Sequence, residues 1–323
     1  MEGSSLAVFA LSAIVAVSLF PGCAVKHSYP TLETQIQKAA VLVEALPYLQ
    51  RFRGHTIVIK VGGSAMEDDD LVRDLVRDVV LLEVVGVNPV IVHGGGKFIS
   101  AAMEEAGLVP EFVRGLRVTD EASIAIVEET LNRKVNPALS AAVDHHGGRA
   151  VSVRGQDVFL AERRPEQDED GNEVDLGFVG TVCGVKPDLV ELAIHGERVP
   201  VVSPLASDAA GGKLPLNVNA DLAASALARQ LRATKLVYLS DVLGVMRNPK
   251  DPGTLIDSLT AAQVDGLIAE GVIKGGMIPK VRSSVEALQA GVGKVHMIDG
   301  RIPHSVLLEV FTDKGIGTEL VLG

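Results

Sequence analysis

The feature that most constrains the fold is a repeated order of three parts: a short β-branched run, a glycine cluster and a segment with helical periodicity. Residues 56–61 are such a run, and they lead through the glycines at 62–63 into a helix expected within residues 68–85. Residues 88–92 lead in the same way into the glycines at 94–96 and a second helix. Alternating strands and helices predict a mostly parallel sheet.

The same order continues along the chain. Further strands are expected at residues 150–153, 199–203, 236–240 and 294–298, and further helices near residues 121–130, 220–231 and 280–290. We therefore predict an α/β fold, with an open, mostly parallel central sheet sandwiched by helices and two lobes at residues 54–199 and 200–323. The polar residues 162–175 indicate an exposed hairpin or loop.

The N-terminal part of the chain has two expected segments. Residues 31–48 carry apolar side chains at helical spacing, which favours a helix that serves as an oligomerisation arm over residues 31–53. Residues 1–30 form an apolar leader whose run at 6–20 has signal-peptide length but no preceding positive charge. Export or anchoring through residues 1–23, an apolar extension and a misassigned start remain open, and we favour a cytoplasmic protein.

Charge and composition exclude several classes of function. Hydrophobic residues make up 47% of the chain, enough for a continuous core, whereas the net charge of −11 argues against a nucleic-acid partner. Membrane contact is not expected of the body that follows the leader. The two cysteines, Cys23 and Cys183, have no metal-site or disulfide-framework spacing.

The glycine clusters indicate anion binding. Lys60 immediately precedes the turn at Gly62 and Gly63, and a second cluster follows His93 and precedes a helix, where backbone amides and the helix dipole favour negative charge. Taken alone, the first cluster could be an ordinary turn beside a solvated lysine. Neither cluster has Walker A or dinucleotide spacing. We interpret His93 as an orienting or backbone-bonding residue rather than a catalytic one.

Three further motifs carry polar side chains suited to anions. Arg117 stands in an apolar context that suits a bidentate grip on a carboxylate, with a surface ion pair as the alternative. Asn217, Asn219 and Asp221 open a helix; capping explains one of them, and we favour a ligand role for Asn217 and an orienting role for Asp221. Lys280 begins a helix, where a cation opposes the dipole unless an anion lies between.

Read in order, these motifs resemble the acetylglutamate kinases of the amino-acid kinase family, over residues 46–323. The motifs that carry the resemblance are KVGG at 60–63, HGGG at 93–96, GLRVT at 115–119, NVNAD at 217–221 and GGMIPK at 275–280.

The resemblance implies ATP-dependent phosphorylation of the side-chain carboxylate of N-acetyl-L-glutamate, with Mg²⁺ carried by the nucleotide and no protein-bound metal. It implies that Lys60 and Lys280 neutralise the phosphoryl group while Asp221 holds both lysines. It also implies an acetylglutamate site at Gly95, Gly96, Arg117, Asn217 and Asn219, and an ATP site at Gly62, Gly63, Asp241, Val242, Gly244, Val272, Lys274 and Gly276.

The segment before residue 54 also resembles the arginine-inhibited branch of this family. That likeness implies a hexamer rather than a dimer, and inhibition by L-arginine through Tyr48, Arg247, His296, Glu309 and Gly315. Two other functions stay open: a non-catalytic nucleotide and arginine sensor, and a sister kinase that acts on free glutamate or aspartate.

Overall fold

The computed structural model describes residues 31–323 except 164, 168–170 and 313–314. The leader at residues 1–30 lies outside the described residues. The chain divides into two compact units, with the boundary between Glu44 and Ala45 inside helix α1 (Leu32–Phe52). The expected N-terminal helix is confirmed, and its bounds lie within the predicted residues 31–53.

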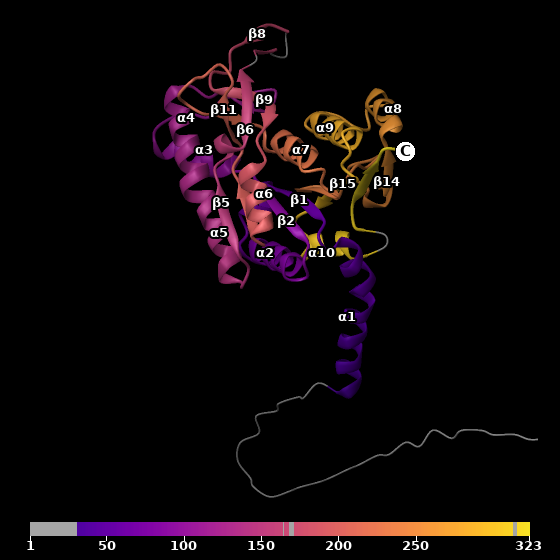
Figure 1. Ribbon diagram of the computed structural model, residues 1–323. Coiled ribbons are helices and arrows are strands. Elements are labelled where there is room, and N and C mark those ends of the chain that lie inside the picture. Colours follow the sequence, from indigo (N-terminus) through magenta and orange to yellow (C-terminus); the bar gives the residue numbers. More distant parts are fainter. Residues whose placement is uncertain (1–30, 164, 168–170, 313–314) are drawn as a thin grey trace, which may run out of the picture. The chain divides into compact units, whose positions relative to one another are not determined.

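The second unit is built on an eight-stranded sheet in which every neighbouring pair is parallel except β15 and β16 (Figure 1). This confirms the prediction of an open, mostly parallel sheet. In spatial order the strands are β14 (Ser258–Thr260), β16 (Thr318–Val321), β15 (Lys294–Asp299), β13 (Lys235–Ser240), β1 (Thr56–Val61), β2 (Asn88–His93), β10 (Val199–Val202) and β5 (Ala150–Val153).

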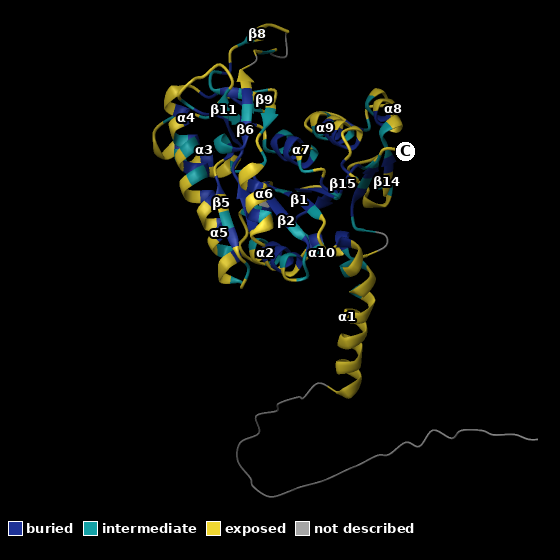
Figure 2. Ribbon diagram, in the orientation of Figure 1, coloured by how far each residue is buried: buried dark blue, intermediate teal, exposed yellow. Residues whose placement is uncertain are grey.

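Helices cover both faces of this sheet because alternate strand residues point to opposite sides. Ile57 and Ile59 pack in one apolar cluster with the helices α2 (Asp69–Val84), α5 (Asn136–His145) and α10 (Ser305–Val310). Val58 packs in the other cluster, which includes the helices α6 (Asp188–His195), α7 (Ala220–Gln230), α8 (Val264–Ala269) and α9 (Met277–Gln289). The central strands β1, β2 and β15 are mostly dark blue in Figure 2, as expected for strands buried on both sides, whereas the edge strands β14 and β5 each keep an exposed residue.

A smaller apolar cluster lies beside the main sheet. It joins α3 (Gly96–Glu105) and α4 (Glu121–Glu128) to the π-helical segment η2 (Glu129–Val135). The helix expected near residues 121–130 therefore continues through η2 and α5 to His145. Pro137 does not stop it; the proline lies at the junction where the π-helical segment η2 passes into α5.

The sequence did not predict a second, closed sheet of four short strands, namely β6 (Phe159–Arg163), β9 (Val179–Val185), β12 (Leu216–Val218) and β11 (Leu205–Asp208). The expected hairpin within residues 162–175 is confirmed by the pair β7 (Glu166–Gln167) and β8 (Glu173–Val174). The remaining short elements are the hairpin strands β3 (Phe112–Val113) and β4 (Leu116–Arg117) and the 3₁₀ turns η1 (Gly63–Met66), η3 (Gly155–Asp157), η4 (Pro252–Thr254) and η5 (Ala261–Gln263).

The topology brings the predicted motifs to one edge of the main sheet. Strand β1 runs parallel to both β2 and β13, so the three carboxyl ends meet at the same edge. Ligands of open α/β sheets bind outside such an edge. In the part of the chain that the structure describes, no helix has the length and apolar character that crossing a membrane requires.

Candidate active site

Two lysines and one aspartate converge at the carboxyl edge of the main sheet. Lys60 Nζ lies 2.8 Å from Asp221 Oδ1, and Lys280 Nζ lies 3.6 Å from Asp221 Oδ2. All three side chains are largely buried, with exposed fractions of 13% for each lysine and 19% for the aspartate. One carboxylate thus holds two ammonium groups that come from distant parts of the sequence.

Each member of this trio is positioned by a regular element. Lys60 lies near the end of β1, and Asp221 stands in the first turn of α7, whose N-terminus is capped by the Asn219 side chain. Lys280 lies on the first turn of α9, where its charge opposes the helix dipole. Asp221 offsets that penalty, and the net charge of the trio remains +1, which suits an anionic ligand.

The protonation states of the trio follow from burial and pairing. Burial raises the pKa of Asp221, but the attraction of Lys60 and Lys280 outweighs it, so the pKa falls below its usual value. Burial lowers the pKa of Lys280, and the charge of Asp221 opposes that shift. Tyr238 contacts two members of the trio. Its hydroxyl donates to the Asp221 carbonyl at 3.2 Å, and the Lys280 ammonium lies 5.7 Å from its ring centre.

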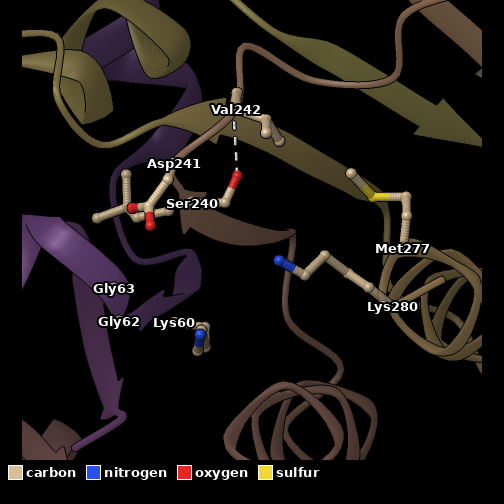
Figure 3. Close-up of a pocket in the computed structure, with 10 residues that line it drawn as sticks. Lys60, Gly62, Gly63, Ser240, Asp241, Val242, Met277 and Lys280 are labelled. Carbon is tan, nitrogen blue, oxygen red and sulfur yellow. Dashed lines mark hydrogen bonds between the residues drawn. The ribbon is translucent and has the colours of Figure 1, made fainter. Parts of the chain in front are cut away.

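A cavity of about 280 Å³ opens on one side of the trio, and Figure 3 shows Lys280 reaching into it from α9 toward the side where Lys60 and the first glycine turn lie. Gly63 has φ +65°, and a methyl group there would lie 2.6 Å from Asp241 Oδ1, so only glycine fits. Five of the residues predicted to bind ATP line this cavity: Gly62, Gly63, Asp241, Val242 and Gly276.

The structure does not bring the other three predicted ATP residues into the cavity. Gly244, Val272 and Lys274 are absent from its lining. Gly244 instead packs against β16, where an added methyl group would lie 2.5 Å from Thr318 Oγ1. Lys274 is exposed in the turn that precedes α9. Gly244 follows the lining residues 239–242 in sequence, and Val272 and Lys274 precede the lining residue Gly276, but none of the three lines the cavity.

A second cavity, of about 250 Å³, lies on the other side of the trio and shares Lys60, Gly62 and Gly63 with the first. Its lining includes the second glycine cluster and all five residues predicted to bind the substrate: Gly95, Gly96, Arg117, Asn217 and Asn219. The two cavities therefore adjoin each other at Lys60 and the first glycine turn. This arrangement could hold a donor and an acceptor of a charged group end to end.

Arg117 is buried rather than paired at the surface. Its Nη2 donates to the Gly96 carbonyl at 2.9 Å and to Ser100 Oγ at 2.8 Å, and its guanidinium lies 4.6 Å from the Phe112 ring centre. Among the described residues no carboxylate pairs with it, so the alternative of a surface ion pair is wrong. Burial lowers the pKa of Arg117, but a guanidinium stays protonated at neutral pH, so an unpaired cation lies at the wall of the second cavity.

The two asparagines of the NVNAD motif have different local roles. Asn219 Oδ1 accepts hydrogen bonds from the backbone amides of Asp221 and Leu222, so it is the helix cap that the sequence required of one of the three polar residues. Asn217 does not cap the helix, and its Nδ2 donates to Thr119 Oγ1 at 3.4 Å. Both residues line the second cavity.

A third cavity, of about 720 Å³, lies at the opposite, amino-terminal edge of β13 and β15. Four of the five residues predicted to contact arginine line it, namely Tyr48, His296, Glu309 and Gly315. The fifth, Arg247, is outside this lining and pairs with Glu270 at 3.8 Å on an exposed surface. Its loop follows β13 at the carboxyl edge of the sheet, which keeps it from the cavity.

The third cavity contains a buried pair of titratable side chains. Glu309 Oε1 lies 2.6 Å from His296 Nδ1, and Glu309 Oε2 accepts from the Ile316 amide at 2.8 Å. Burial raises the pKa of Glu309, but His296, the Ile316 amide and the charge of Lys235 together outweigh burial, so the pKa is lowered. Gly315 has φ +63°, and a methyl group there would lie 2.6 Å from the Glu309 oxygens, so glycine leaves room for the carboxylate.

Lys235 is a cavity residue that the sequence analysis missed. It begins β13, lines the third cavity and lies with its Nζ 5.2 Å from the Phe52 ring centre. Burial lowers its pKa to about 8, against the opposing attraction of Glu309. No local pattern distinguishes this lysine, because it directly precedes an ordinary apolar strand run.

The fold and the site define a class of protein. The model of the amino acid kinase family matches residues 55–299, so the chain belongs to the amino acid kinase family. Within that family, the chain is 54% identical to the acetylglutamate kinase of Akkermansia muciniphila over 286 residues, covering 88% of this chain and 96% of that one. It is 50% identical to the acetylglutamate kinase of Heliobacterium modesticaldum over 290 residues, covering 88% and 97%. The resemblance to the acetylglutamate kinases is thereby confirmed.

Solved structures agree with this fold. The N-acetylglutamate synthase from Neisseria gonorrhoeae, complexed with coenzyme A and N-acetyl-glutamate, superposes with a TM-score of 0.75 at 29% identity. The match covers 88% of this chain, which spans 63% of that synthase. The carbamate kinase from Giardia lamblia bound to AMP-PNP has a TM-score of 0.62 at 20% identity, with 84% and 99% coverage, and shows the shared fold alone.

Proposed function

We infer that this chain transfers the γ-phosphoryl group of ATP to the side-chain carboxylate of N-acetyl-L-glutamate, the kinase step of arginine biosynthesis. The observation that carries the proposal is the pair of adjoining cavities bridged by Lys60, Lys280 and Asp221. The curated relatives named acetylglutamate kinase support the choice of acceptor.

The chemistry requires alignment and charge neutralisation more than proton transfer. The acceptor carboxylate is already a nucleophile, so no general base is needed, and the two lysines would stabilise charge on the migrating phosphoryl group. Mg²⁺ would arrive with the nucleotide and neutralise its phosphates. Proteins usually bind Mg²⁺ through few carboxylates together with substrate phosphates. One carboxylate, that of Asp241, lines the first cavity. Among the described residues, no cluster of three or more potential ligands could hold a metal by itself.

A substrate panel tests the proposal. The purified chain is incubated with ATP, Mg²⁺ and N-acetyl-L-glutamate, L-glutamate or L-aspartate, and the acyl phosphate is trapped as its hydroxamate. We expect hydroxamate with N-acetyl-L-glutamate and at least tenfold less with the free amino acids. A preference for a free amino acid would favour the sister kinase. No product from folded protein would favour the sensor.

We also propose a division of labour along the chain. Residues 54–199 form the acetylglutamate-binding lobe and residues 200–323 the ATP-binding lobe, while a cytoplasmic location suits an enzyme that uses ATP. The glycine cluster at 94–96 and Arg117, both from the first lobe, supply much of the second cavity, whereas Asp241 and Gly276 come from the second lobe. Asn217 and Asp221 reach across from the second lobe to the acceptor side.

We propose that the third cavity binds L-arginine as a feedback inhibitor. Lys235 supplies a cation for the α-carboxylate of an amino acid, and the buried Glu309 carboxylate suits a guanidinium group. Glu319 and Asp257 add negative charge to the same lining. A ligand that carries both a carboxylate and a guanidinium matches this distribution of charge.

Replacing Lys235 with methionine is expected to stabilise the protein and to abolish the arginine response. The folded-state pKa of about 8 lies below the ordinary 10.5, so the ammonium destabilises the fold below about pH 8, and this cost disappears as the pH rises toward 10.5. We expect Lys235→Met to raise the free energy of unfolding by about 1–3 kcal/mol at pH 7. Urea denaturation at pH 7 and pH 10 measures the gain, which should shrink at the higher pH.

The matched control is Arg247→Met, which removes a cation that lies outside the cavity. Kinase rates titrated with arginine should show inhibition in wild type and in Arg247→Met, and none in Lys235→Met. Equal inhibition in all three proteins would contradict the assignment of the cavity.

We propose that the N-terminal helix assembles the chain into a hexamer. In the single chain, α1 leaves several apolar side chains exposed, including Ile36 at 59% and Val43 at 68%. Burying such residues against a second helix is favourable, by about 25 cal/mol per Å² of apolar surface removed from water. The proposal predicts that the assembly depends on the exposed apolar side chains of α1, such as Ile36 and Val43, rather than on the presence of a helix.

The double substitution Ile36→Glu with Val43→Glu is therefore expected to lower the solution mass from six chains toward two. The control Gln35→Glu with Gln37→Glu adds the same charge to exposed polar positions of the same helix and should leave the mass unchanged. Light scattering coupled to gel filtration measures both. A wild-type dimer, or a charged stripe that still assembles as a hexamer, would end the proposal.

A further inference from the structure

His93 lies at the end of β2, directly before the second glycine cluster, and its side chain is fully buried. Its Nδ1 lies 2.8 Å from the carbonyl oxygen of Gly94. A carbonyl can only accept, so Nδ1 must carry the proton in this hydrogen bond. This contact confirms the interpretation of His93 as a backbone-bonding residue.

The surroundings keep the imidazole neutral. Burial lowers the pKa of His93 to about 4, although the bond to Gly94 opposes the shift. Its Nε2 is buried and has no hydrogen-bond partner within the described chain. With Nδ1 protonated and the ring neutral, Nε2 holds a lone pair, so the imidazole is a donor at Nδ1 and nowhere else.

The bond from His93 determines where the next amide points. Gly94 is held on both sides, because its N–H donates to the Val61 carbonyl at 2.6 Å while its own carbonyl accepts from His93. None of the described peptide bonds is cis. In a trans peptide the C=O and the following N–H point in opposite directions, so the Gly95 N–H is directed away from the buried ring.

The Gly95 amide is available to a ligand. It precedes the first residue of α3, so it has no intrahelical acceptor, and none of the described groups accepts a hydrogen bond from it. Gly94, Gly95 and Gly96 all line the second cavity, together with Lys60 and Arg117. An added methyl group at Gly95 would collide with the Leu131 side chain, so only glycine fits at this position without displacing Leu131.

We propose that His93 is a positioning residue for acceptor binding: by holding the Gly94 carbonyl, it aims the Gly95 N–H at the carboxylate of the acceptor in the second cavity. This inference rests on the proposed function for the identity of the acceptor. It assigns His93 no proton transfer. The imidazole acts through the backbone, and the amide that it orients makes the contact.

Three substitutions separate this role from simple packing. In His93→Asn the side-chain amide occupies roughly the place of Nδ1 and can still donate to Gly94. In His93→Gln the amide lies nearer the place of Nε2, and in His93→Leu the volume remains but the donor is lost. We expect leucine and glutamine to raise the KM for N-acetyl-L-glutamate about tenfold or more, with the KM for ATP within about twofold, and asparagine to restore most of the loss.

Nuclear magnetic resonance of ¹⁵N-histidine-labelled protein tests the tautomer independently of activity. We expect His93 with a proton on Nδ1 and none on Nε2 at pH 7. A protonated Nε2 would overturn the inference, as would an asparagine variant that folds normally yet is as impaired as leucine, or an ATP KM that rises in parallel. If the wild-type protein does not phosphorylate N-acetyl-L-glutamate, the proposed function fails, but the inference about His93 can still be tested. The tautomer of His93 and the calorimetric binding of N-acetyl-L-glutamate by the variants do not depend on turnover.

Discussion

Replacing Lys60 or Lys280 with alanine is expected to lower the turnover number by about 10²–10³-fold, the range found when one group that stabilises transition-state charge is removed. Both ammonium groups lie within 3.6 Å of Asp221, between the two cavities, where the migrating phosphoryl group would carry its charge. Binding of N-acetyl-L-glutamate should change less than about threefold, since the interaction is stronger in the transition state than in the ground state.

Steady-state kinetics and isothermal calorimetry with N-acetyl-L-glutamate measure the two effects separately. Lys97→Ala is the matched control, because Lys97 follows the second glycine cluster but pairs with Glu67 at the surface. It should retain at least about half of the turnover. Unchanged turnover in Lys60→Ala and Lys280→Ala would remove the lysines from the chemistry.

Replacing Asp221 with asparagine is expected to affect both stability and the pH dependence of the rate. The carboxylate holds two buried cations, and removing one partner of a buried ion pair costs several kcal/mol, so we expect a loss of about 2–4 kcal/mol in the free energy of unfolding at pH 7. The lowered pKa of Asp221 means that its contribution exists above the ordinary carboxylate pKa and is lost as the pH falls through the folded-state value. The stability difference should therefore diminish in acid.

The rate of the Asp221→Asn variant should fall about 10²-fold and acquire an earlier alkaline decline. Burial lowers the pKa of Lys280, and Asp221 opposes that shift more than Asp241 does, so the substitution lowers that pKa further. The variant should then lose its ammonium charge at a lower pH than wild type does. Turnover measured from pH 6 to 9.5 tests this shift.

The control for this substitution is Asp265→Asn, in the first turn of α8 at an exposed position. It should match wild type in both stability and pH profile. If the turnover of Asp221→Asn declines at the same alkaline pH as that of wild type, Asp221 does not control the charge of Lys280.

The central sheet and the trio could be predicted because their signals are local or ordered along the chain. Strand β1 is a β-branched run, interrupted only by Lys60, that leads into glycines, and it occupies the predicted residues 56–61. Lys60, Asp221 and Lys280 each stand at the end of a strand or the start of a helix. In a parallel sheet such positions converge at one edge, so the order of elements nearly determines the cluster.

The second sheet and the cavity residue Lys235 could not be predicted in this way. Strands β11 and β12 have four and three residues, and they pair with β6 and β9 from a distant part of the chain, so they show no period of their own. Lys235 acquires its importance only from residues distant in sequence, namely Phe52, whose ring centre lies 5.2 Å from its Nζ, and Glu309, whose carbonyl accepts from it at 3.4 Å. Arg247 was assigned to the same cavity from the resemblance, although its loop follows the other end of that strand.

The central claim is that the gap between Lys60 and Lys280 holds the phosphoryl group during transfer. Its most direct test is a crystal structure of the protein with MgADP, tetrafluoroaluminate and N-acetyl-L-glutamate. We expect the planar fluoride complex between the two ammonium groups, with the acceptor carboxylate on the side of Gly95 and ADP on the side of Asp241. A fluoride complex bound beyond hydrogen-bonding reach of both lysines would contradict the account.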